Sequence, residues 1–101
     1  MPHFFVRFQA TRNLEDSELV GALKALALLR EERAILGWRL AHEVRSTPRI
    51  SLELDADNDT HALVNGNMVF VEVLAGANLE GQREVFAPGE VVWRGQGAQT
   101  A

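Results

Sequence analysis

Hydrophobic and polar residues alternate at the start of the chain. Over residues 3–10, Phe4, Val6, Phe8 and Ala10 fall on one side, whereas Phe5 falls among polar residues on the other. This period of two predicts a strand with one buried face. The same alternation predicts a strand over residues 49–55, and two further strands are predicted over residues 38–45 and 90–94.

The hydrophobic period lengthens after the first strand. Apolar residues recur every three or four positions, which predicts a helix; they are Leu19, Leu23, Leu26 and Ala27. We expect Asn13 to cap this helix, and we expect the helix to run to about Leu36 and stop at Gly37. Gly21, in its interior, is expected to permit close contact with the sheet.

The second half of the chain offers weaker signals. Residues 61–64 fit a short strand or one helical turn, and Asn65-Gly66 is typical of a hairpin turn. Residues 67–75 alternate valines and predict a strand. Residues 79–86 predict a short helix that ends before Pro88-Gly89.

Part of the sequence recurs 65 residues later, since residues 6–15 align with residues 71–80 and share Val, Ala, Asn, Leu and Glu in register. Two explanations of this similarity stay open. It results either from chance together with shared helix-capping residues, or from duplication of a strand–helix unit. We predict an α+β fold in which β-α-β units form one mixed sheet with the helices on one face. Residues 1–94 are expected to form one domain, with a disordered tail at residues 95–101.

Composition narrows the functional classes. The chain has 101 residues, a net charge of −4 and no Cys, so a disulfide framework and a thiolate nucleophile are excluded. The acidic balance and the scattered cations argue against nucleic-acid binding. No apolar run approaches the length of a membrane span and no signal-peptide pattern opens the chain, so we expect no membrane association and a cytoplasmic location.

An acidic stretch over residues 55–59 is similar to a calcium loop. It lacks the glycine expected at the sixth position, which is Thr60, and the glutamate expected at the twelfth, which is Gly66. We therefore predict a turn or a helix cap there. The three histidines show no metal-ligand spacing, and we predict neither a metal nor a cofactor.

Pro2 follows the initiator methionine, and a small second residue usually permits removal of that methionine. The free proline amine would then be able to take a proton. In an apolar pocket beside cations its pKa would fall toward neutrality, which suits a general base. The alternative is that the Met-Pro opening has no chemical role.

The opening Met-Pro-His-Phe, the turn Ala10-Thr11-Arg12-Asn13-Leu14-Glu15 and the later Trp38-Arg39-Leu40 together carry a resemblance. The chain resembles the tautomerase superfamily, that is, 4-oxalocrotonate tautomerase and 5-carboxymethyl-2-hydroxymuconate isomerase. This resemblance implies that Pro2 moves a proton in a small enol or keto acid, that Arg12 and Arg39 bind its carboxylate, and that Trp38 or Phe5 supplies an apolar wall. No cofactor is needed.

The resemblance also implies a homo-oligomer, with a trimer favoured and sites between subunits. Phe5, Met68, Phe70 and Leu74 are expected on the uncovered face of the sheet, where they would form an interface. Two alternatives stay open. One is a non-catalytic interaction protein on the same fold, and the other is a ferredoxin-like small-molecule enzyme that dimerises through the uncovered sheet face.

Overall fold

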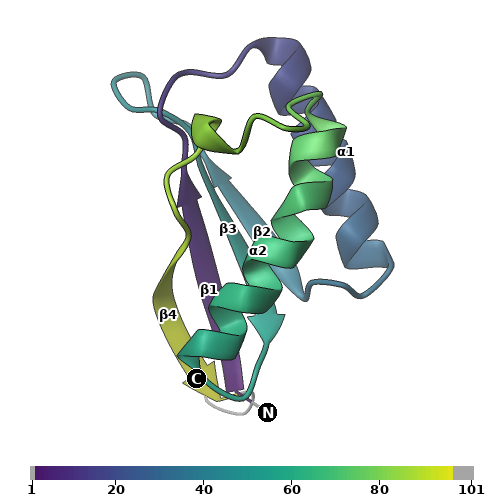
Figure 1. Cartoon of the computed structure of the whole chain (residues 1–101), viewed down its shortest axis with the longest axis vertical. Coiled ribbons are helices and arrows are strands. Elements are labelled where there is room, and N and C mark those ends of the chain that lie inside the picture. Colours follow the sequence, from purple (N-terminus) through teal and green to yellow (C-terminus); the bar gives the residue numbers. More distant parts are fainter. Residues whose placement is uncertain (1, 97–101) are drawn as a thin grey trace.

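A computed structural model describes residues 2–96 of the chain. Its four strands and two helices alternate along the sequence as β1-α1-β2-β3-α2-β4, with a short 3-10 helix before the last strand (Figure 1). The elements are β1 (Pro2–Gln9), α1 (Asp16–Glu31), β2 (Gly37–Ala41), β3 (Arg49–Asp55), α2 (Asp59–Gly76), η1 (Arg83–Val85) and β4 (Glu90–Gln96).

The strands form one sheet in the order β2-β3-β1-β4. Each neighbouring pair runs antiparallel, because each β-α-β crossover passes over one intervening strand. Both helices pack on the same face of the sheet, and the other face is left open by the described residues (Figure 1). The α+β class with helices on one face is thus confirmed, and the strand order is that of ferredoxin-like folds.

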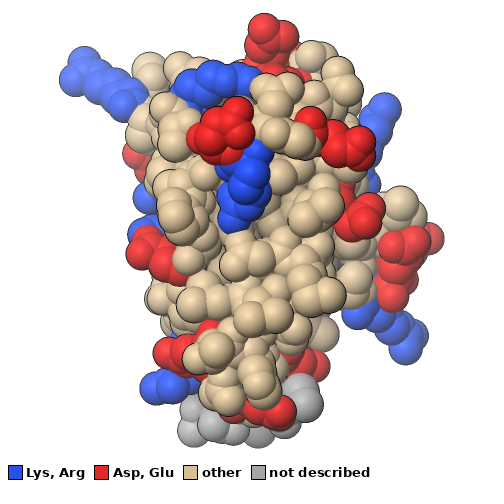
Figure 2. All heavy atoms as spheres, in the orientation of Figure 1, with Lys and Arg blue, Asp and Glu red and all other residues tan. Residues whose placement is uncertain are grey.

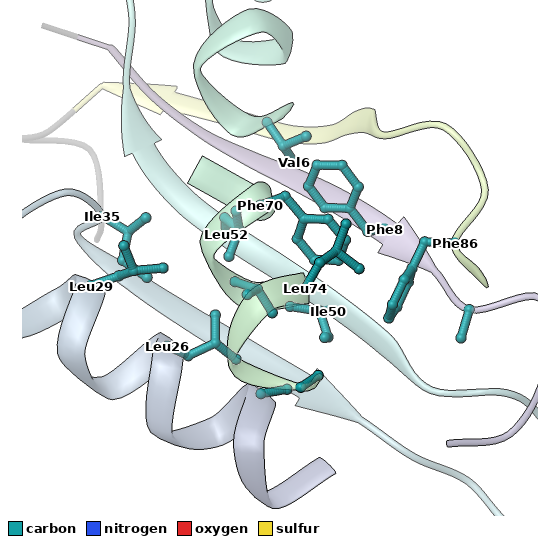
Figure 3. Close-up of a cluster of buried hydrophobic side chains, with 14 of the residues drawn as sticks. Val6, Phe8, Leu26, Leu29, Ile35, Ile50, Leu52, Phe70, Leu74 and Phe86 are labelled. Carbon is teal, nitrogen blue, oxygen red and sulfur yellow. The ribbon is translucent and has the colours of Figure 1, made fainter. Parts of the chain in front are cut away.

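The core lies between the sheet and the two helices. The apolar side of β1 supplies Phe4, Val6 and Phe8, each at most 1% exposed. The Phe8 ring stacks on Phe70 of α2, with ring centroids 4.0 Å apart, and Phe86 meets Phe70 edge-on at 4.9 Å (Figure 3). Apolar burial of this kind is the main favourable term in folding, so the stack ties α2 to the centre of the sheet.

The first helix is shorter than predicted at both ends. Its N-cap is Glu15 rather than Asn13, and the backbone N–H of Glu15 donates to Glu18 at 2.8 Å. It ends at Glu31 rather than Leu36, because Arg33 takes a left-handed φ of 65°. The turn brings Ile35 back into the core and lets β2 begin at Gly37. The second strand ends at Ala41, four residues earlier than predicted.

The hairpin turn predicted at Asn65-Gly66 and the strand predicted over residues 67–75 are wrong, since both segments belong to α2. Of the two alternatives for residues 61–64, the helical one is confirmed. Asn58 caps the helix by accepting a hydrogen bond from His61 N–H at 2.9 Å. Gly66 is buried within the helix, where an added Cβ would lie 3.1 Å from Val6. The glycine therefore serves close helix–strand packing instead of a turn.

The chain after α2 also differs from the prediction. Residues 79–86 hold only the single 3-10 turn η1, after left-handed backbone at Asn78 and Gly81. The similarity between residues 6–15 and 71–80 is not a structural repeat, because Val6 lies in β1 and Val71 in α2. The last strand reaches Gln96, and residues 97–101 of the predicted tail lie outside the described residues.

The outer surface of the helical layer is poor in charge over α2, which carries only Asp59 and Glu72 (Figure 2). Met68, predicted on the open sheet face, is exposed on this helix, and Phe70 and Leu74 are in the core. That prediction is therefore wrong for all three residues, because their segment is helical. Within residues 2–96, neither helix is long and apolar enough to cross a membrane.

The two helices touch through glycine. An added Cβ at Gly21 would lie 2.1 Å from the carbonyl oxygen of Gly76, and one at Gly76 would lie 2.6 Å from the Cβ of Ala25. Such distances are far below van der Waals contact, so side chains at these positions would push the helices apart. Gly21 thus serves contact with α2 rather than the predicted contact with the sheet.

We predict that Gly21→Ala destabilises the protein by about 1–3 kcal/mol through overpacking. The direction of the change in unfolding free energy distinguishes overpacking from helix propensity, because replacing Gly by Ala in a helix interior otherwise stabilises a protein by about 1 kcal/mol. Urea unfolding measures the change, with Lys24→Ala on the exposed side of α1 as the control. A Gly21→Ala variant as stable as the parent would show that the helices do not meet there.

Candidate functional site

Pro2 lies at the first position of β1 and is half-buried. Its carbonyl accepts a hydrogen bond from Ala56 N–H at 3.3 Å. Alternation along β1 places Pro2 on the same side as Phe4, which faces the helices. Pro2 therefore marks the end of the strand where β3 leads into α2.

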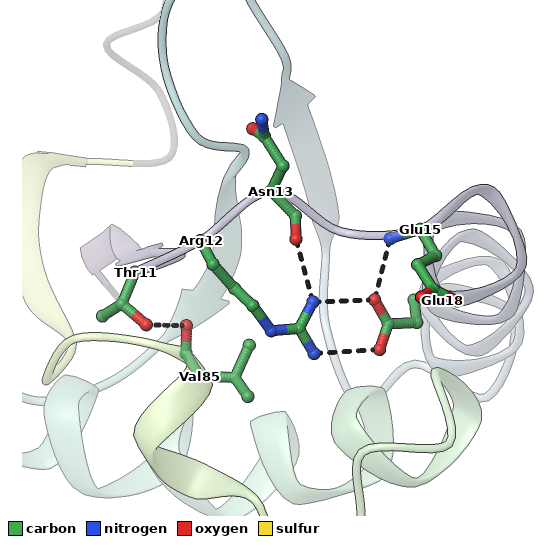
Figure 4. A network of polar contacts seen from close by, with 6 residues as sticks. All are labelled: Thr11, Arg12, Asn13, Glu15, Glu18 and Val85. Atoms are coloured by element: carbon green, nitrogen blue, oxygen red, sulfur yellow. Dashed lines mark hydrogen bonds and ion pairs between the residues drawn. The ribbon is translucent and has the colours of Figure 1, made fainter.

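Arg12 lies beyond the opposite end of β1. Its guanidinium forms a two-pronged ion pair with Glu18, with Nη1–Oε1 at 3.0 Å and Nη2–Oε2 at 3.1 Å (Figure 4). Nη1 also donates to the carbonyl of Asn13 at 2.8 Å. Arg12 thereby fastens the loop before α1 to the first turn of that helix.

One chain does not bring Pro2 and Arg12 together. The eight-residue strand β1 lies between them, and it spans roughly 26 Å at about 3.3 Å per residue. Arg39 is also distant from Pro2. It lies opposite Ser51, which in turn lies opposite Arg7, roughly 17 Å along β1 from Pro2.

The open face of the sheet does bring predicted residues together. The guanidinium of Arg39 lies over the ring of Phe5, with Cζ 5.0 Å from the ring centroid. Trp93 of β4 meets the same ring at 5.5 Å and an angle of 63°. A cation and two aromatic rings therefore cross the sheet from β2 to β4.

A hollow of about 410 Å³ lies at the β2 edge of this face. Phe5, Trp38 and Arg39, which are three of the five predicted site residues, line it together with Arg30 and Glu53. Leu36 and Gly37 complete the lining. The absence of a side chain at Gly37 leaves room for the Glu53 carboxylate, which would lie 3.0 Å from an added Cβ.

Charges on this face are only partly paired. Glu53 Oε2 lies 3.5 Å from His3 Nδ1, and Asp55 Oδ1 lies 3.2 Å from His3 Nε2. Within residues 2–96, neither Arg30 nor Arg39 forms an ion pair. The hollow thus holds two guanidinium groups whose carboxylate partners are not supplied by the described part of the chain.

Sequence reasoning missed Arg30 and a second arginine, Arg83. Arg30 lies in the last turn of α1 and lines the hollow from there, whereas the predicted helix continues to Leu36. Arg83 donates to Asn67 Oδ1 at 2.7 Å across 16 residues of sequence. The cap at Asn58 and the spacing of Ala62, Gly66 and Phe70 are signals that would have predicted the helix over residues 59–76. The contact between Asn67 and Arg83 has no such signal, because it depends on how the chain turns back after α2.

The acidic stretch predicted as a turn or cap does cap α2, through Asn58. No group of three or more His, Asp or Glu side chains within residues 2–96 is placed to hold a metal ion.

No family model matches the chain, and comparisons with curated proteins and with solved structures gave no significant match.

The Arg12–Glu18 network predicts an acid-sensitive start of α1. The ion pair with Arg12, and then the hydrogen bond from Glu15 N–H, hold the pKa of Glu18 below its ordinary value. A carboxyl group whose pKa is lower in the folded state than in the unfolded state stabilises the fold at pH values above the unfolded-state pKa. This stabilisation is lost as the pH falls through the folded-state pKa.

We therefore expect Glu18→Gln to be less stable than the parent near neutral pH, and we expect the difference to shrink between about pH 5 and about pH 2. Thermal unfolding followed by circular dichroism over this range measures both effects. Glu31→Gln, at the other end of α1, is the matched control. A Glu18→Gln deficit that is the same at every pH would contradict the linkage.

Proposed function

We propose that this protein binds a small carboxylate-bearing molecule in the hollow lined by Phe5, Arg30, Trp38 and Arg39. The observation that carries the proposal is the placement of Arg39. Its guanidinium lies 5.0 Å from the Phe5 ring centroid, at the hollow, with no ion-pair partner among residues 2–96. Guanidinium groups bind carboxylates through paired, charge-assisted hydrogen bonds.

The surroundings of Arg39 favour a ligand with an apolar body. Phe5 supplies aromatic surface next to the cation, so a carboxylate on Arg39 would leave the rest of a small molecule against this ring. Trp38, the preceding residue of β2, packs toward the core and lines the hollow from the helix side of the strand. Arg30 adds a second positive charge, whereas Glu53 adds a negative one and selects against a second anionic group nearby. These charges favour a monocarboxylate over a dicarboxylate.

Proton transfer by Pro2, as the tautomerase resemblance implies, is a second candidate function. The position of Pro2 at the start of β1 supports it. Because Pro2 lies on the helix side of β1, whereas Phe5 and the Arg39 guanidinium lie on the open face, this reaction needs the proline of a neighbouring copy beside Arg39. The predicted homo-oligomer, with a trimer favoured, would provide that arrangement, and Arg12 would remain outside the site.

Arg39→Gln is expected to weaken binding of phenylpyruvate roughly tenfold, because a charge-assisted hydrogen bond contributes about 1.5–3 kcal/mol. Isothermal titration calorimetry measures the dissociation constants. Arg45→Gln, which removes the same charge from the exposed loop after β2, is expected to bind like the parent. Equal affinity in the parent and Arg39→Gln would refute the assignment of this hollow as the carboxylate site.

The tautomerase candidate has its own test. Native mass spectrometry is expected to give a subunit mass lacking Met1 and an assembly of three subunits. Conversion of phenylenolpyruvate to its keto form, followed by ultraviolet absorbance, is expected to fall at least about a hundredfold in Pro2→Ala. Retention of Met1, or activity that Pro2→Ala leaves unchanged, excludes Pro2 as the base without touching the binding proposal.

A further inference from the structure

A second hollow lies on the helix-covered side of the molecule, away from the proposed carboxylate site. Its volume is about 590 Å³, within the range of small-molecule sites. Three segments line it, namely α2, η1 and the chain leading to β4. The lining residues are Leu63 and Asn67 of α2, Arg83 and Glu84 of η1, and Phe86, Pro88 and Gly89 before β4. The two hollows share no residue.

Arg83 is held in place from two directions. Its Cζ lies 5.4 Å from the ring centroid of Phe8 and 5.5 Å from that of Phe70, the two rings that stack in the core. Its Nη2 donates to Asn67 Oδ1 at 2.7 Å. Asn67 is itself oriented, because its Nδ2 donates to the carbonyl of Leu63 at 2.8 Å. The guanidinium is therefore preorganised.

The charge of Arg83 is not neutralised by this arrangement. Its hydrogen-bond partner is a neutral amide, and aromatic faces accept no strong hydrogen bond. Within residues 2–96 no carboxylate lies within ion-pair distance of it, including Glu84 at the same hollow. A half-buried cation that keeps most of its five donors free favours an anion beside it.

The walls of the hollow define the rest of the ligand. Leu63, Phe86 and Pro88 are apolar, and Gly89 lies so close to Phe8 that an added Cβ would be 2.6 Å from the ring. The loop before β4 can thus lie flat along the core only with glycine at this position. An aliphatic or aromatic body would contact these walls while its anionic end meets Arg83.

We propose that Arg83 and this hollow form a second binding site, for a small organic monocarboxylate with an apolar body. The site is independent of the proposed function, since neither Arg39 nor Phe5 contributes to it. Glu84, which repels an anion at the same hollow, limits its affinity.

Hexanoate tests the site, with the neutral hexanamide of equal length as the matched probe. Titration of the ¹⁵N-labelled full chain is expected to shift the backbone amide signals of Leu63 and Gly89 with hexanoate and to leave them unmoved with hexanamide at the same concentration. Hexanamide that binds as well as hexanoate would overturn the anionic requirement. Orthophosphate that binds as tightly as hexanoate would overturn the apolar requirement.

Two variants test which charged side chains determine hexanoate binding. Arg83→Met keeps an apolar side chain against Phe8 and Phe70 and is expected to weaken hexanoate binding roughly tenfold. Glu84→Gln is expected to strengthen it about two- to fivefold, by removing a repulsion in water-exposed surroundings. Arg45→Gln controls for the change in net charge. Unchanged binding in Arg83→Met, with a thermal midpoint like the parent's, overturns the proposal.

Should Arg83→Met fail to fold, Glu84→Gln still decides the question, because weaker or equal hexanoate binding in that variant contradicts an anion at this hollow. The amide signals also separate this site from the hollow at Arg39. Shifts confined to Gly37 and Arg39 would support the first proposal and exclude the second, and shifts confined to Leu63 and Gly89 would do the reverse.

Discussion

The packing of α2 on β1 is the contact on which the rest of the molecule depends. Gly66 lets the helix approach Val6 closely, and Phe70 then stacks on Phe8 one turn further along. A larger residue at position 66 would lift the helix from the strand and separate the rings. The strand–helix–strand crossovers place both helices on the same face of the sheet, and α1 lies against α2 where Gly21 meets Gly76. The layer of helices is therefore narrow, closely packed and confined to one side.

Both arginine sites follow from this one-sided arrangement. The uncovered face of the sheet presents the outward residues of β1 and β2, so that Phe5 and Arg39 meet without a helix over them. On the covered side, the Arg83 guanidinium lies beside the Phe8–Phe70 stack, at nearly the same distance from both rings. One strand thus supplies an aromatic ring to each site, from opposite sides of its alternating pattern.

The elements with one buried face were predictable, because β1 and β3 alternate with a period of two and their observed bounds lie within a residue of the predicted ones. The second helix was not predicted, since its valines at alternate positions and its Asn65-Gly66 pair are typical of a hairpin. The glycine is explained only by the tertiary contact between Gly66 and Val6. Phe5 and Arg39 were predicted and lie together, because strand register sets their positions, whereas Trp38 lines the same hollow from the other side of β2. Arg12 was predicted for the same site and lies elsewhere, because it forms an ion pair with Glu18, six residues later. The spacing between Arg12 and Pro2 in the sequence gives no sign of this partner.

Three arginines illustrate how a carboxylate ligand would be selected. Arg12 already holds the carboxylate of Glu18 in two hydrogen bonds, so an incoming carboxylate would have to displace an equivalent group and would gain little. Arg39 has an aromatic neighbour and no ion pair within residues 2–96, but its side chain is exposed, and water competes for its donors. Arg83 is half-buried, oriented by Asn67 and supported by two rings, and water solvates it less completely. An anion of the right shape therefore gains more at Arg83 than at Arg39, provided that the repulsion from Glu84 is small. At each proposed site, the affinity for a carboxylate would be set by the existing partners of the guanidinium and by its exposure to water, more than by the number of positive charges nearby.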